Sequence, residues 1–318
     1  MSQANLERAI QLVNTGSVED GIQMLREVAA AGDPEGLFVL ADLTWSGSFV
    51  SQDPVRGRLL FEYSAALGHA RANILTTNLL GSGIGGRRNW PAALERLAAE
   101  AQQLPDRRDT LTLLEAMDLD ENGDPAAVPE ATQVSEHPHV RVIEQLVRPA
   151  ECDYLIATAE PHFQPSMVYD ENGREAKDTI RTSDGAAISW LLENPAIHAI
   201  NRRLASATGT RYLQGEALQV LRYIPGQEYR PHFDFLEGVE NPRPWTALLY
   251  LNDDYEGGAT AFVETDLEFR GRAGDVLVFR NEGADGRRDP LAKHAGMPVT
   301  AGTKYLATRW IRQNRWIP

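Results

Sequence analysis

The chain has 318 residues and carries 45 acidic against 31 basic side chains, which gives a formal net charge of −14 at neutral pH. This length suggests two domains, and the acidic balance argues against non-specific binding to nucleic acid or to anionic membranes. No apolar run approaches the length of a membrane span. The single cysteine, Cys152, excludes an intrachain disulfide. Because the first residues also show no export signal, we expect a protein of the reducing cytoplasm.

Residues 1–120 have the pattern of amphipathic helices with an internal repeat of 36 residues. The segment Ala29–Pro34 returns as Ala65–Ala70. At the same offset lie three further pairs: Leu43 and Leu79, Gly47 and Gly83, Asp53 and Asn89. A period of this length indicates an α-solenoid of helix pairs, and the segment resembles the longer variety of tetratricopeptide-like repeats. We expect this domain either to dock a protein or to act as a stabilising cap.

Residues 121–137 are rich in proline, glycine and acidic side chains, which is typical of an interdomain linker. The run from Asp118 to Asp124 has part of the acidic spacing of a calcium loop, but the later bidentate glutamate is missing. We therefore place the domain boundary here and expect a second domain over residues 138–318.

The second domain begins with an expected strand over Val140–Ile143 and helices over Pro149–Ala159 and Pro195–Ala207. After Glu216 the pattern changes to short apolar segments separated by glycine-rich turns, which predicts a β-sandwich or barrel. The expected strands are Ala217–Tyr223, Ala247–Leu251, Thr260–Val263, Asp275–Phe279 and Lys304–Ile311. Two polar segments, Ser166–Ile180 and Phe235–Pro244, are expected as loops, and the first as a mobile loop at the mouth of the site.

His232 and Asp234 lie two residues apart, and His294 follows downstream. Alternate residues of a strand point to one face, so one imidazole and one carboxylate can converge on a single ion. A histidine from another strand would complete the two-His, one-carboxylate triad of non-haem Fe(II), which leaves three positions open. A His-x-Asp pair alone is common on surface loops, so this hypothesis depends on its context.

That context is a set of segments that occur in a fixed order. They are Arg181–Ser183, Glu216–Asp234, Arg243–Asn252, Gly257–Phe262, Gly271–Phe279, His294–Val299, Gly302–Lys304 and Thr308–Ile311. Together they resemble the prolyl 4-hydroxylase branch of the Fe(II)/2-oxoglutarate dioxygenases over residues 138–318. The resemblance implies an α+β chain: a C-terminal double-stranded β-helix, or jelly roll, with flanking helices, preceded by the all-α helical-repeat domain.

The resemblance makes His232, Asp234 and His294 the iron ligands and the catalytic residues. It implies that Lys304 pairs with the far carboxylate of 2-oxoglutarate. Tyr223 is expected to donate its hydroxyl to the same co-substrate, and Thr246 is a weaker candidate for that role. Fe(II), 2-oxoglutarate and O2 are therefore the expected cofactors, and ascorbate is a further candidate.

On the substrate side, the positions that surround a peptide in the family correspond to Arg181, Ser183, Glu216, Tyr229, Arg243, Trp310 and Arg312. Tyr229 and Trp310 suit a prolyl ring because an aromatic face packs on its apolar surface. Arg243 offers a planar fork to a backbone carbonyl. Arg312 stands where some relatives carry a histidine, which leaves the peptide preference open. Packing and structural ion pairs are the alternative roles for this group.

The implied activity is hydroxylation of a C–H bond, foremost 4-hydroxylation of a peptidyl proline, with succinate and CO2 as co-products. The alternatives are a hydroxylase of a free amino acid or other small molecule, and an inactive oxygenase-like scaffold, which the complete ligand set disfavours. We expect a peptide, a protein or an amino-acid-like molecule as the partner, with protein docking on the repeats, and neither nucleic acid nor a membrane. The substrate, the carbon oxidised and the oligomeric state remain open at this level.

Overall fold

The computed structural model describes residues 3–169, 175–177 and 180–316, and the chain divides into two compact units. The first unit takes in the chain up to Ala116 and also Trp190–His198. The second holds Met117–Ser189 and the chain from Ala199 onward. Among the described helices, none is both long and apolar enough to cross a bilayer.

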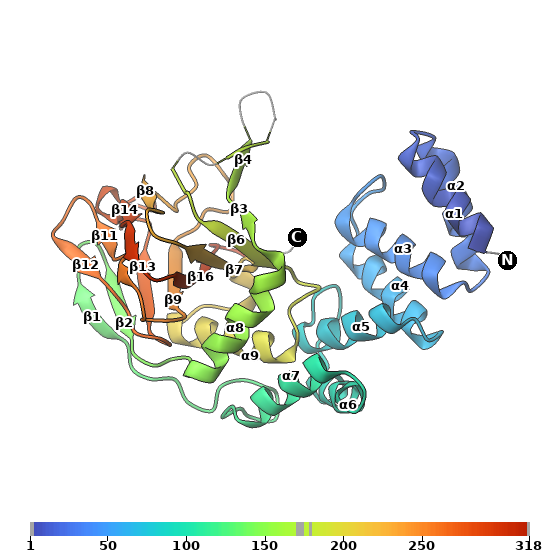
Figure 1. The fold of residues 1–318 in the computed structure, drawn as a ribbon, viewed down its shortest axis with the longest axis horizontal. Helices are drawn as coiled ribbons and strands as arrows, with labels where there is room; N and C mark the ends of the chain where they lie inside the picture. The colour runs from blue at the N-terminus through green and yellow to red at the C-terminus, as the bar shows by residue number, and fades with distance from the viewer. Residues whose placement is uncertain (1–2, 170–174, 178–179, 317–318) are drawn as a thin grey trace. The chain divides into compact units, whose positions relative to one another are not determined.

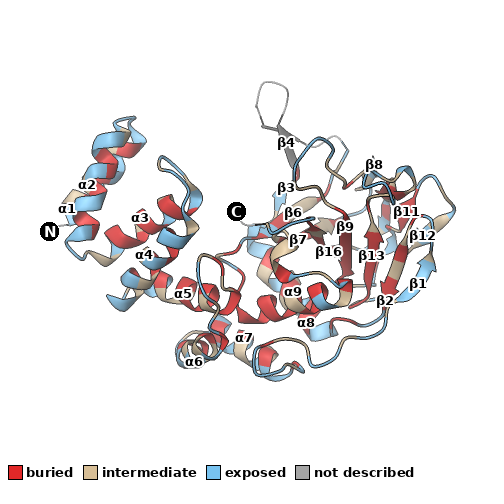
Figure 2. Cartoon of the chain, turned by 180° about the vertical axis from the view of Figure 1, so that it is seen from behind, coloured by how far each residue is buried: buried red, intermediate tan, exposed pale blue. Residues whose placement is uncertain are grey.

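The first unit is a succession of helices, each of which packs against the next (Figure 1). The helices are α1 (Gln3–Asn14), α2 (Val18–Ala30), α3 (Pro34–Ser46), α4 (Pro54–Ala66), α5 (Ala70–Ser82), α6 (Trp90–Ala101) and α7 (Pro105–Glu115). Figure 2 shows buried and exposed residues in alternating stripes along these helices, as expected for amphipathic helices that share a core. Leu25, Leu37 and Leu40 belong to that core in the first three helices.

The backbone confirms the 36-residue repeat, because α3 and α4 begin 36 residues before α5 and α6. Gly47 and Gly83 end α3 and α5 in the same left-handed conformation, with φ 76° and ψ 12° at both positions. Asp53 and Asn89 cap α4 and α6, since each side chain accepts a hydrogen bond from the backbone N–H three residues ahead. Glycine adopts the left-handed turn without strain and short polar side chains cap helices well, so equivalent residues build equivalent turns.

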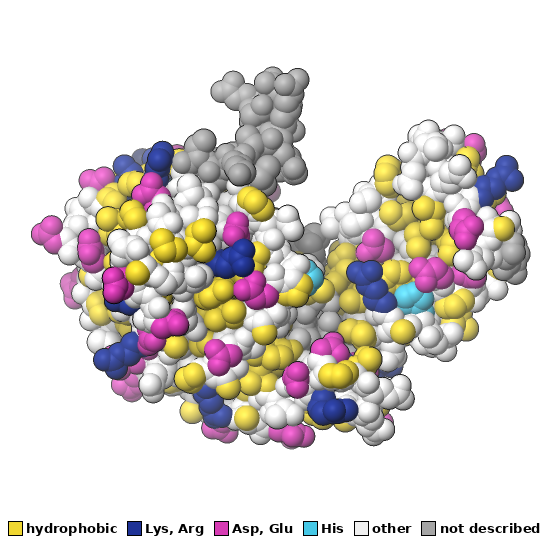
Figure 3. Space-filling view, viewed as in Figure 1, with side chains coloured by type: hydrophobic (Ala, Val, Ile, Leu, Met, Phe, Trp, Pro, Cys, Tyr) yellow, Lys and Arg dark blue, Asp and Glu magenta, His cyan; other side chains and the backbone are white. Residues whose placement is uncertain are grey.

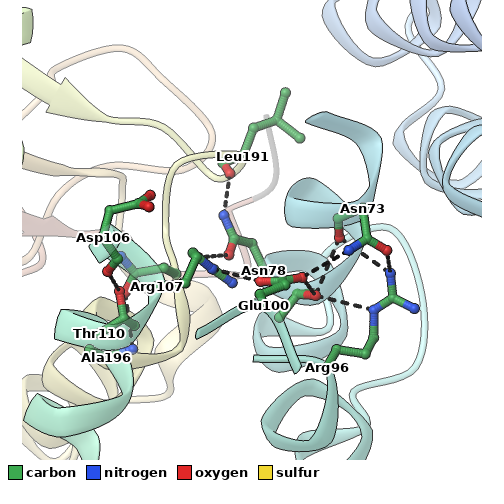
Figure 4. A network of polar contacts seen from close by, with 11 residues as sticks. Asn73, Asn78, Arg96, Glu100, Asp106, Arg107, Thr110, Leu191 and Ala196 are labelled. Atoms are coloured by element: carbon green, nitrogen blue, oxygen red, sulfur yellow. Dashed lines mark hydrogen bonds and ion pairs between the residues drawn. The ribbon is translucent and has the colours of Figure 1, made fainter. Parts of the chain in front are cut away.

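A buried polar network joins the last helices of this unit (Figure 4). Glu100 on α6 accepts hydrogen bonds from Thr77 Oγ1 at 2.5 Å and from Arg107 Nε at 2.6 Å. Arg107 donates to Asn78 Oδ1 at 3.2 Å, and Asn78 Nδ2 donates to the carbonyl of Leu191 at 2.8 Å. Because Glu100 and Arg107 are both buried, each offsets the desolvation of the other. The network holds Leu191, which is distant in sequence, against α5.

The segment Trp190–His198 therefore belongs structurally to the repeats. The rings of Trp90 and His198 lie 6.0 Å apart, and Pro195 approaches Gly81 of α5. Helix α9 (Pro195–Thr208) passes from the first unit into the second after His198. The boundary expected at residues 121–137 is thus not the only crossing between the units.

The second unit has two antiparallel sheets in its described part (Figure 1). The larger sheet has the order β1-β2-β13-β9-β16-β7-β6-β3, and the smaller has the order β12-β11-β14-β8. The strands of the larger sheet are β1 (Thr132–Ser135), β2 (Val140–Ile143), β3 (Gln164–Pro165), β6 (Asp184–Ile188), β7 (Leu218–Tyr223), β9 (Trp245–Tyr250), β13 (Val276–Arg280) and β16 (Lys304–Ile311). The strands of the smaller sheet are β8 (Tyr229–His232), β11 (Thr260–Phe262), β12 (Leu267–Phe269) and β14 (His294–Gly296). Short pairs form between β10 (Glu256–Gly257) and β15 (Val299–Ala301), and between β4 (Met167–Tyr169) and β5 (Glu175–Lys177).

The core of this unit lies between the two sheets, as the double-stranded β-helix requires. Phe262 of the smaller sheet meets Phe279 of the larger one edge to face, with ring centroids 5.2 Å apart. Val140, Leu277 and Leu306 extend the same buried cluster across the larger sheet. The β-helix is thus held by apolar side chains that alternate along strands far apart in sequence.

Helix α8 (Pro149–Ala159) packs against β6 and β7 of the larger sheet. It is tied to the C-terminal part of α9 by a buried, two-pronged ion pair. Arg203 donates to the two carboxylate oxygens of Glu151 at 2.7 and 3.0 Å. Glu151 also accepts the backbone N–H of Arg148 at 2.7 Å, so the carboxylate both caps α8 and fixes its neighbour.

The strands predicted after Glu216 and at Val140–Ile143 are all present within a residue or two, and both predicted helices form. Phe235–Pro244 is a loop, as expected. Two expectations need correction. The linker predicted at 121–137 contains β1, because Gln133 and its neighbours pair with β2. In the predicted loop Ser166–Ile180, β4 pairs with β5, while residues 170–174 and 178–179 lie outside the described residues.

Candidate active site

Two neighbouring strands of the smaller sheet bring His232, Asp234 and His294 together. His232 on β8 and His294 on β14 are register partners across the strand pair. Asp234 lies two residues beyond His232, just past the end of β8. Its carboxylate oxygens are 3.7 Å from His232 Nε2 and 3.6 Å from His294 Nε2. One ligand atom from each residue lies within 4.8 Å of the other two, so the three can hold a single ion.

Hydrogen bonds fix which imidazole nitrogen faces the centre of the site. His232 Nδ1 lies 2.8 Å from the carbonyl oxygen of Arg230, and His294 Nδ1 lies 3.0 Å from that of Ala292. A carbonyl oxygen only accepts, so each Nδ1 carries the hydrogen and each Nε2 keeps its lone pair. This arrangement is typical of metal-binding histidines, whose second nitrogen donates to an outer partner.

Asp234 is held in place by a chain of buried polar groups. Thr246 Oγ1 on β9 donates to Asp234 Oδ2 at 2.7 Å, and Asn281 Nδ2 donates to Thr246 Oγ1 at 2.9 Å. Thr246 therefore orients a ligand of the triad and is not among the described residues that line the pocket. The expected contact of Thr246 with 2-oxoglutarate stays a prediction. Asn281 escaped the sequence analysis, since an asparagine just after a strand is usually only a turn residue.

The protonation states suit a metal ion. Burial, together with the neighbouring His294, lowers the pKa of His232 to about 4. Burial alone would raise the pKa of Asp234, but the two imidazoles and the Thr246 hydroxyl outweigh burial and lower it. Near neutral pH the site thus presents a neutral His232 and an ionised carboxylate, which is the form that binds a metal. Two imidazole nitrogens and one carboxylate are the donor set of non-haem Fe(II) sites with open positions.

Lys304 and Tyr223 face the same pocket from neighbouring strands. They are register partners on β16 and β7, and both are buried. Lys304 Nζ donates to the carbonyl of Gly258 at 2.7 Å and lies 5.5 Å from the ring centroids of Tyr223 and Tyr250. Burial, together with the charge of Arg270, lowers the pKa of Lys304 to about 7. No described carboxylate pairs with this ammonium, so an anion that enters the pocket would supply its counter-charge.

One pocket connects the triad to Lys304. Three of the predicted substrate residues, Arg181, Tyr229 and Trp310, line it together with Tyr223. The ring of Tyr229 stacks on His232 at a centroid distance of 3.4 Å. The Arg181 guanidinium lies 5.5 Å from the centroid of the Tyr229 ring and donates to Gln219 at 3.2 Å. An arginine and an aromatic ring thus stand directly beside the metal ligands.

Three other predicted substrate residues form an ion-pair cluster. Arg243 grips Glu216 with two hydrogen bonds of 2.6 and 2.8 Å, and Arg312 Nε donates to the same carboxylate at 2.5 Å. The Arg243 guanidinium also lies 4.2 Å from the Trp310 ring. None of the three charged residues is among the described residues that line the pocket. The structural ion pair considered for Glu216 is therefore present, and its Arg243 packs against the ring of Trp310.

Ser183 is buried beneath the pocket wall, with its Oγ 3.3 Å from that of Ser166. A further contact that sequence analysis missed joins Tyr250 to Thr260, whose hydroxyl groups lie 2.8 Å apart. Thr260 lines the pocket on the side of Lys304. Its position in the expected strand Thr260–Val263 gave no sign of this role, since threonine is common in strands.

The fold and this site define the class of protein. A family model described as the 2OG-Fe(II) oxygenase superfamily matches residues 218–312, a stretch that includes the triad and Lys304. The protein is thus an Fe(II)- and 2-oxoglutarate-dependent dioxygenase that uses O2.

The comparison with individual relatives narrows the class. The chain is 36% identical over 200 residues to prolyl 4-hydroxylase 1 of Arabidopsis thaliana, a match that covers 57% of this chain and 71% of the relative. It is 33% identical over 203 residues to the probable prolyl 4-hydroxylase 3 of the same plant, covering 56% and 70%. This chain belongs to the prolyl 4-hydroxylase type of the 2OG-Fe(II) oxygenases. Among solved structures, the viral collagen prolyl hydroxylase of Paramecium Bursaria Chlorella virus-1 is 24% identical, with a TM-score of 0.45, and covers 56% of this chain and 98% of its own.

Proposed function

We propose that the protein 4-hydroxylates a proline residue within a peptide or protein, with conversion of 2-oxoglutarate to succinate and CO2. The observation that carries the proposal is the wall of Arg181, Tyr229 and Trp310 beside a complete iron triad. This arrangement stands in a chain whose relatives bear the name prolyl 4-hydroxylase.

Each residue of the site has a definite task in this proposal. His232, Asp234 and His294 hold the iron, with Thr246 keeping the carboxylate oriented. When bound, Fe(II) supplies the coupling between oxidative decarboxylation of 2-oxoglutarate and oxidation of a substrate C–H bond. Lys304 neutralises the far carboxylate of 2-oxoglutarate.

The aromatic wall orients the substrate. The pyrrolidine ring is apolar and packs against an aromatic face, which Tyr229 and Trp310 provide. Arg181 offers hydrogen-bond donors to a backbone carbonyl next to that ring. Because Tyr229 stacks on His232, a ring seated against Tyr229 lies close to the metal ligands. The Glu216, Arg243 and Arg312 cluster keeps Trp310 in position from behind.

We also infer that the partner is not nucleic acid and that the protein works in the cytoplasm. The net charge is −14, and on the face in Figure 3 basic side chains lie scattered among acidic ones without forming a basic patch. The single cysteine, Cys152, is buried, and burial raises its pKa to about 12. An inert thiol of this kind suits a reducing compartment.

The proposal is tested by supplying the full chain with Fe(II), 2-oxoglutarate, O2 and ascorbate, and with either a proline-rich peptide or free proline. Mass spectrometry should show one oxygen atom added to the peptide. One mole of succinate should form for each mole of oxygenated peptide. Chromatography of the hydrolysed peptide should identify 4-hydroxyproline. Turnover confined to free proline would establish the small-molecule alternative. Asp234→Ala serves as the control that separates enzymatic from metal-catalysed oxidation.

A further inference from the structure

Helices α2 and α3 with loop 47–53 form a first copy of the 36-residue repeat, and α4 and α5 with loop 83–89 form a second copy that differs from it beneath the loop. In the second copy, Arg58 on α4 is buried and fastens the loop 83–89 that follows α5. Its guanidinium donates to the carbonyl oxygens of Leu79, Ile84 and Arg87 at 3.0, 3.2 and 3.2 Å. It also pairs with Glu62 at 2.8 Å. The side chain of Arg58 therefore lies beneath the loop between α5 and α6 and binds its carbonyl oxygens.

The first copy lacks this arginine. At the 36-residue offset, Ile22 on α2 replaces Arg58, and Arg26 replaces Glu62. Isoleucine is shorter and carries no donor, so no side chain of the described residues takes the place of Arg58 beneath the corresponding loop 47–53. An open groove of about 810 Å³ results, and its lining includes Ile22, Arg26 and the loop residues Gly47 and Phe49. The groove is a direct consequence of the Arg-to-Ile difference between the copies.

Phe49 is an unusual residue for its position in this loop. Its φ is 65°, in the left-handed region that an L-residue adopts only with strain. The equivalent residue of the second copy is Gly85, with φ 70°. The side chain of Phe49 is nevertheless 58% exposed and makes no ring contact among the described residues. An exposed aromatic residue at a position suited to glycine does not serve the fold, and it lines the groove.

The groove carries opposite charges at its two ends. Glu19 and Asp20 on the first turn of α2 line one end. Arg26, further along α2, lines the groove and also an adjoining cavity of about 210 Å³, whose lining includes Asp53 and Arg56. Asp53 Oδ1 is engaged by the backbone N–H of Arg56, whereas no described residue pairs with the guanidinium of Arg26 or Arg56. The far end thus has two arginines against one aspartate.

We propose that this groove binds an extended peptide segment in which an apolar side chain lies between a basic and an acidic residue. The apolar side chain packs on Phe49 and Ile22. The basic residue faces Glu19, and the acidic residue faces Arg26 and Arg56. The backbone N–H groups of the segment donate to the carbonyls of Ser48 and Ser51, which are the equivalents of the Ile84 and Arg87 carbonyls that Arg58 binds in the second copy. This binding site is separate from the hydroxylation site, and the proposal does not depend on the identity of the oxygenase substrate.

Fluorescence anisotropy with the full-length protein tests this binding mode. The probes are three dye-labelled octapeptides without proline, each with two central leucines between terminal glycines. The bipolar probe carries two lysines on one side and two glutamates on the other, and the other two probes carry only lysines or only glutamates. The bipolar probe should bind most tightly. Its failure to bind at protein concentrations up to about 1 mM would overturn the proposal.

Variants then locate the binding. Phe49→Gly should weaken binding of the bipolar probe about tenfold or more, because it removes the apolar contact, while the melting temperature stays level or rises. Arg26→Gln should weaken the bipolar and acidic probes about two- to fivefold and spare the basic one. Arg8→Gln, an exposed arginine on α1 outside the groove, is the matched control and should change affinity by less than about twofold. Equal effects of Arg8→Gln and Arg26→Gln would refute the assignment.

Introducing the Arg58 and Glu62 pair of the second copy at the equivalent positions of the first copy provides an independent test. The double variant Ile22→Arg with Arg26→Glu should close the groove from below, as Arg58 and Glu62 do in the second copy. Binding of the bipolar probe should be lost with the melting temperature retained. A Phe49→Gly variant that binds as well as the wild type, or that melts earlier because Phe49 supports the fold, would overturn the proposal.

Discussion

Replacing Lys304 by methionine should raise the stability of the free protein and lower its affinity for 2-oxoglutarate. The ammonium is buried, and its pKa is about 7 against an ordinary value of 10.5. At 1.36 kcal/mol per pKa unit, this difference means that charging Lys304 below pH 7 costs the folded protein about 5 kcal/mol. Methionine fills a similar volume and carries no charge. Without co-substrate, Lys304→Met should therefore melt at a higher temperature than the wild type at pH 6.

The same substitution should weaken 2-oxoglutarate binding. A hydrogen bond to a charged group contributes about 1.5–3 kcal/mol, which corresponds to roughly a ten- to hundredfold rise in the dissociation constant. Calorimetric titration of 2-oxoglutarate into the anaerobic Fe(II) protein measures this constant, and a thermal melt of the same sample without co-substrate measures stability. Lys293→Met is the control, because that side chain is 36% exposed. An unchanged dissociation constant in Lys304→Met would show that the co-substrate carboxylate binds elsewhere.

Three further outcomes follow from the site. The affinity for 2-oxoglutarate should fall as pH rises above about 7, by up to tenfold per pH unit, because the free protein loses the Lys304 proton there and the bound anion favours the charged form; a flat profile from pH 7 to 9 would contradict this. Asp234→Ala should abolish succinate formation and iron retention while the melting curve keeps its shape, and normal turnover would remove Asp234 from the metal site. Thr246→Val should reduce Fe(II) affinity about 10- to 100-fold, since Asp234 loses its donor, and Thr15→Val, at an exposed position just after α1, is the control; equal affinities in both variants would deny Thr246 an orienting role.

Much of the fold follows from local patterns in the sequence. Gly47 and Gly83 occupy the same left-handed turn, so the 36-residue offset in the sequence maps directly onto the helices. His232 and Asp234 are two residues apart at the end of a strand, which places both near one ion. In both cases, the conformation of one turn or one strand determines where these residues lie relative to one another.

The contacts that the sequence did not reveal join distant segments of the chain. Thr246 reaches Asp234 through the pairing of β9 with its neighbours, and Asn281 reaches Thr246 from the next strand along. Glu216 takes two arginines from other segments, which no spacing along the chain reveals. The groove beneath loop 47–53 became visible only when the two copies were compared position by position in three dimensions.

The repeat unit is formed by two separate stretches of the chain, and this determines when the unit can be completed during synthesis. Asn78 and Trp90 emerge from the ribosome before Leu191 and His198, their partners in the finished unit. The intervening residues 117–189 take about 4–15 s to make at roughly 5–20 residues per second. During that interval, the first-made helices present an unfinished surface. Their unit therefore closes only after the opening strands of the oxygenase exist, and the two parts of the protein mature together.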